Sequence, residues 1–192
     1  MDVIEFGSFY NDETQKKEKI EWMVLDEDEE TLFVVSKKIL GVAPYDKEEK
    51  TWEESLMRRG LNTKFYDAAF NSFEKECIVT TKVELTDWNY YFEPTFDKIF
   101  LLSRDEVEKY FPELALQQFE DKEIFPCAWW LRNIVNSVGP GAILVREDGS
   151  YGSEGRYSVE GVRPAMRILK NYLDLLPPEA VPGQTSMFEN ED

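Results

Sequence analysis

The chain has 192 residues, of which 42% are hydrophobic and 14% aromatic, which is enough for one folded domain with its own core. Its net charge of −17 argues against binding nucleic acid through a basic groove, because acidic groups repel phosphate. The chain has no histidine, which excludes Ser-His-Asp and Cys-His nucleophiles and removes the commonest neutral metal ligand.

The sequence also bears on the cellular compartment. It has no apolar run long enough to cross a bilayer, and its opening Met-Asp-Val-Ile-Glu is acidic where a secretory signal is basic. We therefore expect a cytoplasmic protein without a membrane association. In that compartment Cys77 and Cys127 are expected to be buried thiols, although they could pair in space.

The first third of the chain predicts β-structure. A short strand is expected over residues 3–9, and strands over 20–25 and 31–36 flank an acidic turn and predict a hairpin. Five consecutive acids, residues 26–30, suggest calcium at first sight, but the spacing lacks a glycine and an EF-hand register. We expect a solvated turn.

Residues 51–77 predict short helices. Thr51 and Glu54 have the spacing of a capping box, and Gly60 suits the end of that helix. Asn62 is expected to cap a second helix, and Ser72 a third.

The second half predicts one further helix followed by a β-rich region. A strand is expected over residues 97–102, and Ser103 with Glu106 forms a capping box that opens the helix. Residues 113–128 suggest an irregular connection. Strands over 141–146 and 157–163 are expected to pair across the turn Asp148-Gly149-Ser150, and an apolar strand over 165–169 follows.

From residue 177 the composition becomes rich in proline and then acidic, which indicates a flexible tail. We therefore predict one domain over residues 1–176 and a tail over residues 177–192.

Several motifs, in a fixed order, resemble one bacterial and phage family, the domain of unknown function DUF6273. The resemblance covers the chain from about Ile4 to Leu169. It rests on Ile20-Glu21-Trp22, Ser36-Lys37, Pro44-Tyr45, Thr51-Trp52, Arg59, Leu61-Asn62, Asp97-Lys98-Ile99-Phe100-Leu101-Leu102-Ser103, Trp129-Trp130-Leu131-Arg132 and Gly161-Val162-Arg163-Pro164-Ala165.

The resemblance implies a fold similar to the C-type-lectin-like fold of formylglycine-generating enzymes. We therefore expect a mixed α+β domain with an N-terminal hairpin, central short helices and a late β-rich region that displays a ligand-binding face. Cys77 and Cys127 do not match the copper-binding pair of those enzymes, and no lectin-type calcium motif is complete. No cofactor, metal or catalytic residue is therefore assigned.

Two arginines adjoin the most unusual motifs. Arg132 follows the double tryptophan, and Arg163 precedes a proline. A guanidinium beside aromatic rings can stack and bind a carboxylate, so one interpretation is a ligand pocket formed by Trp129, Trp130, Arg132 and Arg163. The other interpretation is that both arginines bind internal carboxylates and hold loops in place.

The tail carries a candidate partner motif. Gln184-Thr185-Ser186-Met187-Phe188 resembles the short peptide with which many bacterial replication and repair proteins bind the sliding clamp. Met187 and Phe188 would be apolar anchors, while Gln184 would form hydrogen bonds at the pocket edge and Ser186 would fill the third motif position. The alternatives are a chance match or docking of the tail on its own domain.

These observations favour a non-enzymatic binding module that recognises a protein or small ligand, with the sliding clamp as a candidate partner of the tail. Two alternatives stay open. One is an enzyme with an unfamiliar site of carboxylates and arginines, for which a cleft with a perturbed pKa pair would be diagnostic. The other is an acidic phage inhibitor that occupies a basic groove of a host protein, without direct nucleic-acid binding of its own.

Overall fold

The computed structural model describes residues 1–11, 14, 16–87, 90–91, 93–112, 128–135 and 141–175. The strands are β1 (Val3–Asn11), β2 (Lys16–Glu27), β3 (Thr31–Ser36), β4 (Gly41–Pro44), β5 (Ile78–Val79), β6 (Thr81–Val83), β7 (Thr86–Asp87), β8 (Tyr90–Tyr91), β9 (Thr95–Asp97), β10 (Phe100–Leu101), β11 (Trp129–Val135), β12 (Gly141–Val145), β13 (Tyr151–Gly155), β14 (Val159–Val162) and β15 (Pro164–Leu169). The helices are α1 (Leu56–Gly60), the π-helical turn η1 (Leu61–Phe65), α2 (Tyr66–Ala69), α3 (Ser72–Cys77), α4 (Arg104–Tyr110) and α5 (Tyr172–Leu175).

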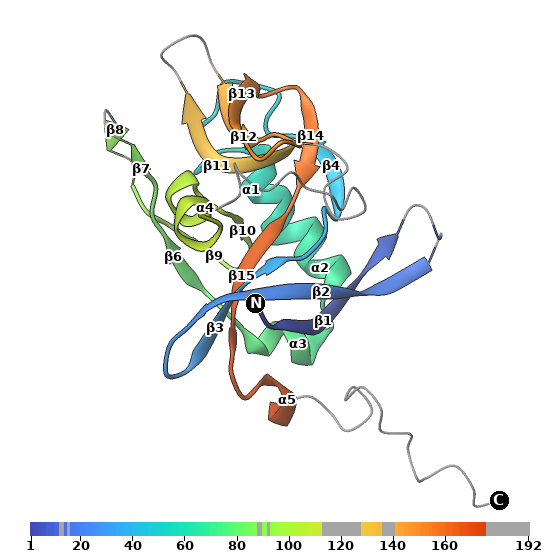
Figure 1. The fold of residues 1–192 in the computed structure, drawn as a ribbon. Coiled ribbons are helices and arrows are strands. Elements are labelled where there is room, and N and C mark those ends of the chain that lie inside the picture. Colours follow the sequence, from blue (N-terminus) through green and yellow to red (C-terminus); the bar gives the residue numbers. More distant parts are fainter. Residues whose placement is uncertain are drawn as a thin grey trace, which may run out of the picture.

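Two larger sheets organise the fold. The six-stranded sheet has the order β1-β2-β3-β15-β10, with β5 also pairing with β15, and the five-stranded sheet has the order β13-β12-β11-β14-β4. In Figure 1 the five-stranded sheet lies at the top and the six-stranded sheet below it, and the helical segment runs from α1 near the upper sheet to α2 on the right of β15. The chain therefore has a mixed α+β fold, as the sequence predicts.

Two neighbouring strands pass together from one sheet to the other. β3 leads into β4 through residues 37–40, and β14 leads into β15 through Arg163 alone. β3 pairs antiparallel with β15 in the six-stranded sheet, and β4 pairs antiparallel with β14 in the five-stranded sheet. The two ladders therefore bend together at a corner, which we call the Arg163 corner (Figure 1).

The central helices form a nearly continuous segment from α1 to α2, with η1 as a wider turn between them. Asn62 holds this turn against the loop before β10. Its side-chain amide donates to the carbonyls of Arg58 (3.0 Å) and Ile99 (2.7 Å), and its side-chain oxygen accepts from the N–H groups of Lys98 (2.8 Å) and Ile99 (3.1 Å). Three of these four bonds satisfy backbone groups of the loop at Lys98 and Ile99, and the fourth goes to a carbonyl of α1, so one side chain joins the loop to the helical segment.

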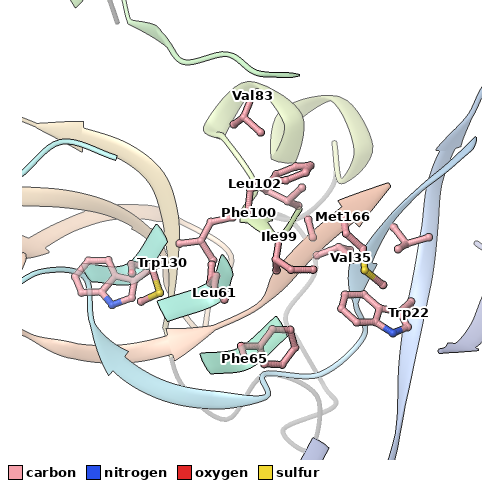
Figure 2. Packing of buried hydrophobic residues seen from close by; sticks show 14 of the residues in the cluster. Trp22, Val35, Leu61, Phe65, Val83, Ile99, Phe100, Leu102, Trp130 and Met166 are labelled. Carbon is pink, nitrogen blue, oxygen red and sulfur yellow. The ribbon is translucent and has the colours of Figure 1, made fainter. Parts of the chain in front are cut away.

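One cluster of buried apolar side chains lies under both sheets and the helices. Figure 2 shows Trp22, Val35 and Met166 at one end of this cluster and Trp130 and Leu61 at the other. The two sheets and the helical segment therefore share a single core within the described residues.

Several predicted elements are confirmed. The hairpin of residues 20–36 is present as β2 and β3, which pair antiparallel. The capping box of Ser103 and Glu106 is present at the start of α4, with both reciprocal hydrogen bonds formed. The strand predicted over residues 165–169 is β15.

The predicted pairing of residues 141–146 with 157–163 is wrong. β12 pairs with β13 across the turn that contains Gly149, whose φ of 79° suits glycine. β14 instead lies between β11 and β4, parallel to the former. The turn signal at residues 148–150 was therefore correct, but a second reversal before β14 sends that strand elsewhere.

Three predicted helix caps are also wrong. α1 is capped by Ser55, whose side chain accepts from the Arg58 N–H, and not by Thr51. α3 is capped by Asn71, which forms a capping box with Glu74, so Ser72 is the first helical residue. Asn62 lies inside η1 and has the bridging role described above. Neighbouring polar residues all carry capping signals, and tertiary contacts select among them.

The predicted strand over residues 97–102 is divided into β9 and β10, because the Asn62 side chain binds the backbone between them. The predicted domain boundary and the tail lie among residues 176–192, outside the described residues. Within the described part of the chain, no helix is long and apolar enough to cross a membrane.

Candidate functional site

The double tryptophan lies at the start of β11 and is buried. Trp129 is 1% exposed and Trp130 is 0% exposed. The Trp130 indole N–H donates to the Ala43 carbonyl (2.9 Å), and its ring packs edge-on against Tyr45 at 5.9 Å between centroids. Trp130 therefore joins β11 to the chain around β4, across the core of the five-stranded sheet.

Arg132, also on β11, uses every one of its N–H groups inside the protein. Its guanidinium donates twice to the Glu106 carboxylate, twice to the Glu84 carbonyl and once to the Leu101 carbonyl (2.8 Å). A guanidinium has five N–H donors, so these five bonds saturate it. Arg132 thus ties β11 to the first turn of α4, where Glu106 also completes the capping box.

Arg163 fills the corner between the two sheets. Its Nε donates to the carbonyl of Ser36, the last residue of β3, at 3.0 Å. The guanidinium carbon lies 4.7 Å from the Trp129 ring centroid and 5.7 Å from that of Phe111. Burial lowers the pKa of Arg163 to about 9, which leaves the group protonated at neutral pH. Aromatic faces and a carbonyl oxygen therefore solvate this buried charge.

The four residues predicted to form a ligand pocket are thus interior residues. Arg163 contacts Trp129, whereas Arg132 lies beside α4, where it lines a small hollow of about 240 Å³ with Glu106 and Arg167. All four are at most 4% exposed. Their predicted role in ligand binding stays a prediction, and their observed contacts are with other parts of the protein.

The predicted partner-binding residues of the tail lie outside the described residues: Gln184, Ser186, Met187 and Phe188. Cys127 also lies outside them, so its relation to Cys77 stays open. Cys77 itself is a free, buried thiol, and burial raises its pKa. A thiol with a raised pKa is a weak nucleophile at neutral pH.

An open hollow lies between β4 and the helical segment, and none of the predicted site residues that the structure describes lines it. This groove has a volume of about 610 Å³, and we call it the cationic groove. Its apolar lining includes Leu40, Val42, Met57, Leu61, Phe65, Val162 and Pro164, and its basic lining is Lys47, Arg59 and Lys64. Met57, Leu61 and Phe65 are buried members of the core, so the floor of the groove is continuous with the hydrophobic interior.

The charge of the cationic groove is opposite to that of the whole chain. Its lining has three basic residues and no acidic residue, although the chain has 39 acids and 22 basic residues. Lys47 and Lys64 make no ion pair with any described residue, and Arg59 makes one long bond of 3.5 Å to the Glu54 carbonyl. The groove therefore offers exposed positive charge beside apolar surface, which attracts an anionic group next to an apolar one.

One wall of the groove is the edge strand of a sheet. β4 is the last strand in the order of the five-stranded sheet, and its outer edge has no partner strand among the described residues. Val42, in the middle of β4, is 61% exposed. A Cβ built on Gly41 would meet no atom within 4 Å, so the face of β4 at this residue is open. Unpaired N–H and C=O groups on an edge strand can bind an extended peptide.

A signal in the sequence could have found this groove. Residues 56–66 include Arg58, Arg59 and Lys64 but no acid, which is unusual in a chain of this charge. The remaining lining comes from the segments around Phe9, residues 40–47 and residues 162–164, and only the folded chain brings these segments together. Local reversal of charge sign was therefore the available clue.

Comparison with models of protein families assigns the chain to one family. A family model described as a domain of unknown function, DUF6273, matches residues 29–170. The chain belongs to the DUF6273 family. No curated protein and no solved structure matches it.

The DUF6273 match includes almost the whole cationic groove. β4, α1, η1 and the Arg163 corner lie inside residues 29–170, whereas Phe9 on β1 lies outside them. The candidate tail residues also lie outside the matched range. The groove of this chain therefore lies almost wholly within the matched range, and the preceding strand β1 contributes Phe9 to its lining.

Proposed function

We propose that this DUF6273 protein is a binding module, and that its cationic groove takes an extended peptide segment in which apolar side chains adjoin acidic ones. One observation carries the proposal. Three exposed basic residues and no acidic residue line an apolar groove in a chain with a net charge of −17. The basic residues of the groove would attract the acids of such a peptide, and the apolar lining would bury its apolar side chains.

The shape of the groove favours a peptide over a compact ligand. β4 presents an unpaired edge along one wall, so a peptide laid beside it would gain main-chain hydrogen bonds. Alternate side chains of that peptide would point into the apolar floor formed by Met57, Leu61 and Phe65. Its acids would then lie near Lys47 and Lys64, whose charges have no internal partner among the described residues.

The lining favours recognition over catalysis. The groove contains no cysteine, tyrosine, serine or carboxylate side chain. Its single hydroxyl belongs to Thr63, and this hydroxyl donates to the Arg59 carbonyl at 2.7 Å. The groove therefore holds no pair of groups suited to nucleophilic attack and proton transfer.

The enzyme hypothesis has a different location in the molecule. A polar cleft of about 690 Å³ contains Asp97 and Lys98, and burial lowers the pKa of Lys98. Asp97, however, accepts hydrogen bonds from Arg58 (2.6 Å), from Trp52 and from Thr95. These bonds give Asp97 a structural role between α1 and β9, and they favour the binding module.

Three finer hypotheses also stay proposals. The C-type-lectin-like relation rests on the sequence motifs, since no solved structure matches the chain. Binding of the sliding clamp rests on residues 184–188, and the acidic inhibitor rests on the net charge. The cationic groove is compatible with each of them, because an interaction module can carry more than one surface.

Selection of peptides from a random library displayed on phage, with the purified full chain as target, tests the proposed function. We expect the enriched peptides to share apolar residues next to Asp or Glu. The affinity of a synthetic copy, measured by fluorescence anisotropy, should fall at least tenfold in the Lys47→Glu/Lys64→Glu variant, which corresponds to about 1.4 kcal/mol. The free energy of unfolding of this variant should change by less than about 0.5 kcal/mol, because both side chains are exposed.

The matched control is Lys82→Glu/Lys170→Glu, which makes the same change of charge at two exposed lysines outside the groove lining. Its affinity for the peptide should stay within twofold of wild type. Equal binding by both double variants, or enrichment of peptides without acids, would show that the groove is not the binding site.

A further inference from the structure

Residues 184–192 of this same chain have the chemistry that the cationic groove favours. Their sequence, Gln-Thr-Ser-Met-Phe-Glu-Asn-Glu-Asp, places two large apolar residues directly before three acids. Residues 176–192 as a whole contain four acids and no basic residue. The groove, in turn, contains three basic residues and no acid. The acids of the tail therefore match the basic residues of the groove, and the apolar residues of the tail match its apolar lining.

We infer that this segment docks in the cationic groove of its own chain, with Met187 and Phe188 on the apolar floor and Glu189 and Glu191 toward Lys64 and Lys47. The inference rests on the proposed function, and it names the ligand that fills the groove when no other partner is present.

The chain is long enough for this docking. The last described helix, α5, ends at Leu175, and its Tyr172 ring lies 5.5 Å from the Phe6 ring. Phe6 lies 5.6 Å from Phe70, and Phe70 lies 5.9 Å from Phe65, which lines the groove. The rings of Tyr172 and Phe65 can therefore be no farther apart than the sum of these three centroid distances. The eleven residues 176–186 can reach about 36 Å when extended, about twice that sum, which leaves length for a path over the surface.

Attachment to the same chain strengthens the contact. A short linker gives a tethered segment an effective concentration on the order of 1 mM. A peptide with a dissociation constant of about 100 μM would then fill the groove most of the time. Weak complementarity is therefore sufficient in cis, where the same peptide added in solution would bind only partly.

Docking of the tail would also control whether the clamp-like motif at residues 184–188 can bind another protein. Met187 and Phe188 are the residues that the clamp-like motif would use as anchors, so a docked tail cannot offer them to another protein. A partner that takes the tail would open the groove, and a peptide that takes the groove would release the tail. The two binding events would favour one another, as linkage requires.

Hydrogen exchange of the full chain, followed by mass spectrometry, tests the inference. The readout is the exchange rate of the Val42 amide, the N–H of β4 that faces away from β14. The N–H groups of Gly41 and Ala43 face β14, and Pro44 has no N–H. In the Met187→Ser/Phe188→Ser variant we expect the Val42 amide to exchange at least fivefold faster than in wild type. The control variant Glu179→Gln/Val181→Ser changes the same stretch of chain outside the motif and should leave the rate unchanged.

Charge reversal provides a second test. Lys47→Glu/Lys64→Glu should also speed exchange of the Val42 amide, and adding Glu189→Lys/Glu191→Lys to that variant should restore the slow rate. Equal exchange in wild type and in the Met187→Ser/Phe188→Ser variant would overturn the inference. Protection that grows between 2 and 100 μM protein would also overturn it, because it would assign the docked segment to a second copy of the chain.

The two proposals fail in different ways. If the tail fills the groove, a phage-selected peptide should bind the Met187→Ser/Phe188→Ser variant at least tenfold more tightly than wild type. If that peptide depends on Lys47 and Lys64 but binds both chains equally, the docking inference is wrong and the proposed function stands. If its binding does not depend on Lys47 and Lys64, the proposed function is wrong.

Discussion

Two pairs of basic residues in this acidic protein have opposite surroundings. Arg132 and Arg163 are buried, and their guanidinium groups bind carbonyls, a carboxylate and aromatic faces of the protein. Lys47 and Lys64 are exposed in the cationic groove and have no ion-pair partner among the described residues. The comparison teaches that an arginine beside aromatic residues can be part of the framework, whereas a basic cluster without acids marks a surface for a partner.

The largest expected effect is at the Arg163 corner. Arg163→Ala should lower the free energy of unfolding by about 4 kcal/mol, because it leaves a cavity and removes the contact with Trp129. Arg59→Ala, at an exposed arginine of the cationic groove, is the control and should change it by less than about 0.5 kcal/mol. Urea unfolding measures both. A stable Arg163→Ala protein that loses a ligand would instead place Arg163 in a binding site.

An intermediate effect is expected at Arg132. Arg132→Met should lower the free energy of unfolding by about 3 kcal/mol, since the Glu106 carboxylate and two carbonyls lose their donor. The Arg132→Met/Glu106→Gln double variant should lose less than the two single variants together, with a coupling of at least about 1 kcal/mol. Arg104→Met, which breaks the exposed pair with Glu108, should cost less than about 1 kcal/mol. Additive effects at Arg132 and Glu106 would show that the ion pair between these two residues does not hold β11 against α4.

The smallest effect is expected at Asp26, where hydrogen bonds from Tyr110 (2.7 Å) and Lys109 (3.2 Å) lower the pKa from 3.8 to about 2. The ionised carboxylate therefore stabilises the folded state above pH 4, and this contribution is lost as the pH falls from about 4 to about 2. It should amount to less than about 1 kcal/mol, because the side chains of Asp26 and Lys109 are 43% and 63% exposed, so solvent screens the pair.

Urea unfolding between pH 2 and pH 5 checks this expectation. The Asp26→Asn variant should lose stability less steeply over that range than wild type does. Glu29→Gln removes another exposed acid of the same turn and should leave the slope unchanged. Identical slopes for wild type and Asp26→Asn would show that the contact with Tyr110 and Lys109 does not form in solution.

The parts of the fold that depend on neighbouring residues were predictable. The β2–β3 hairpin and the capping box of Ser103 and Glu106 each rest on a few adjacent positions, and both are confirmed. The choice of Asn71 over Ser72 as a cap, and the position of β14 between β11 and β4, depend on contacts between distant segments. Periodicity and spacing carry no information about such contacts.

The same limit applies to the candidate site. The sequence motifs drew attention to Trp130 and Arg132 because large aromatic and basic residues stand together there, and the structure places both in the interior. The cationic groove is lined by segments as far apart as Phe9 and Pro164, so no short motif describes it. The run without acids over residues 56–66 is the local signal of the groove that the sequence contains.

The Arg163 corner has a mechanical consequence for the groove. An occupant of the groove would touch Val42 and Val162 on one sheet and Phe9 and Pro164 on the other. Because the occupant would contact both sheets at once, its affinity would depend on the angle at which the two sheets meet. A substitution deep inside the corner could then tune binding without altering a single atom that the occupant contacts.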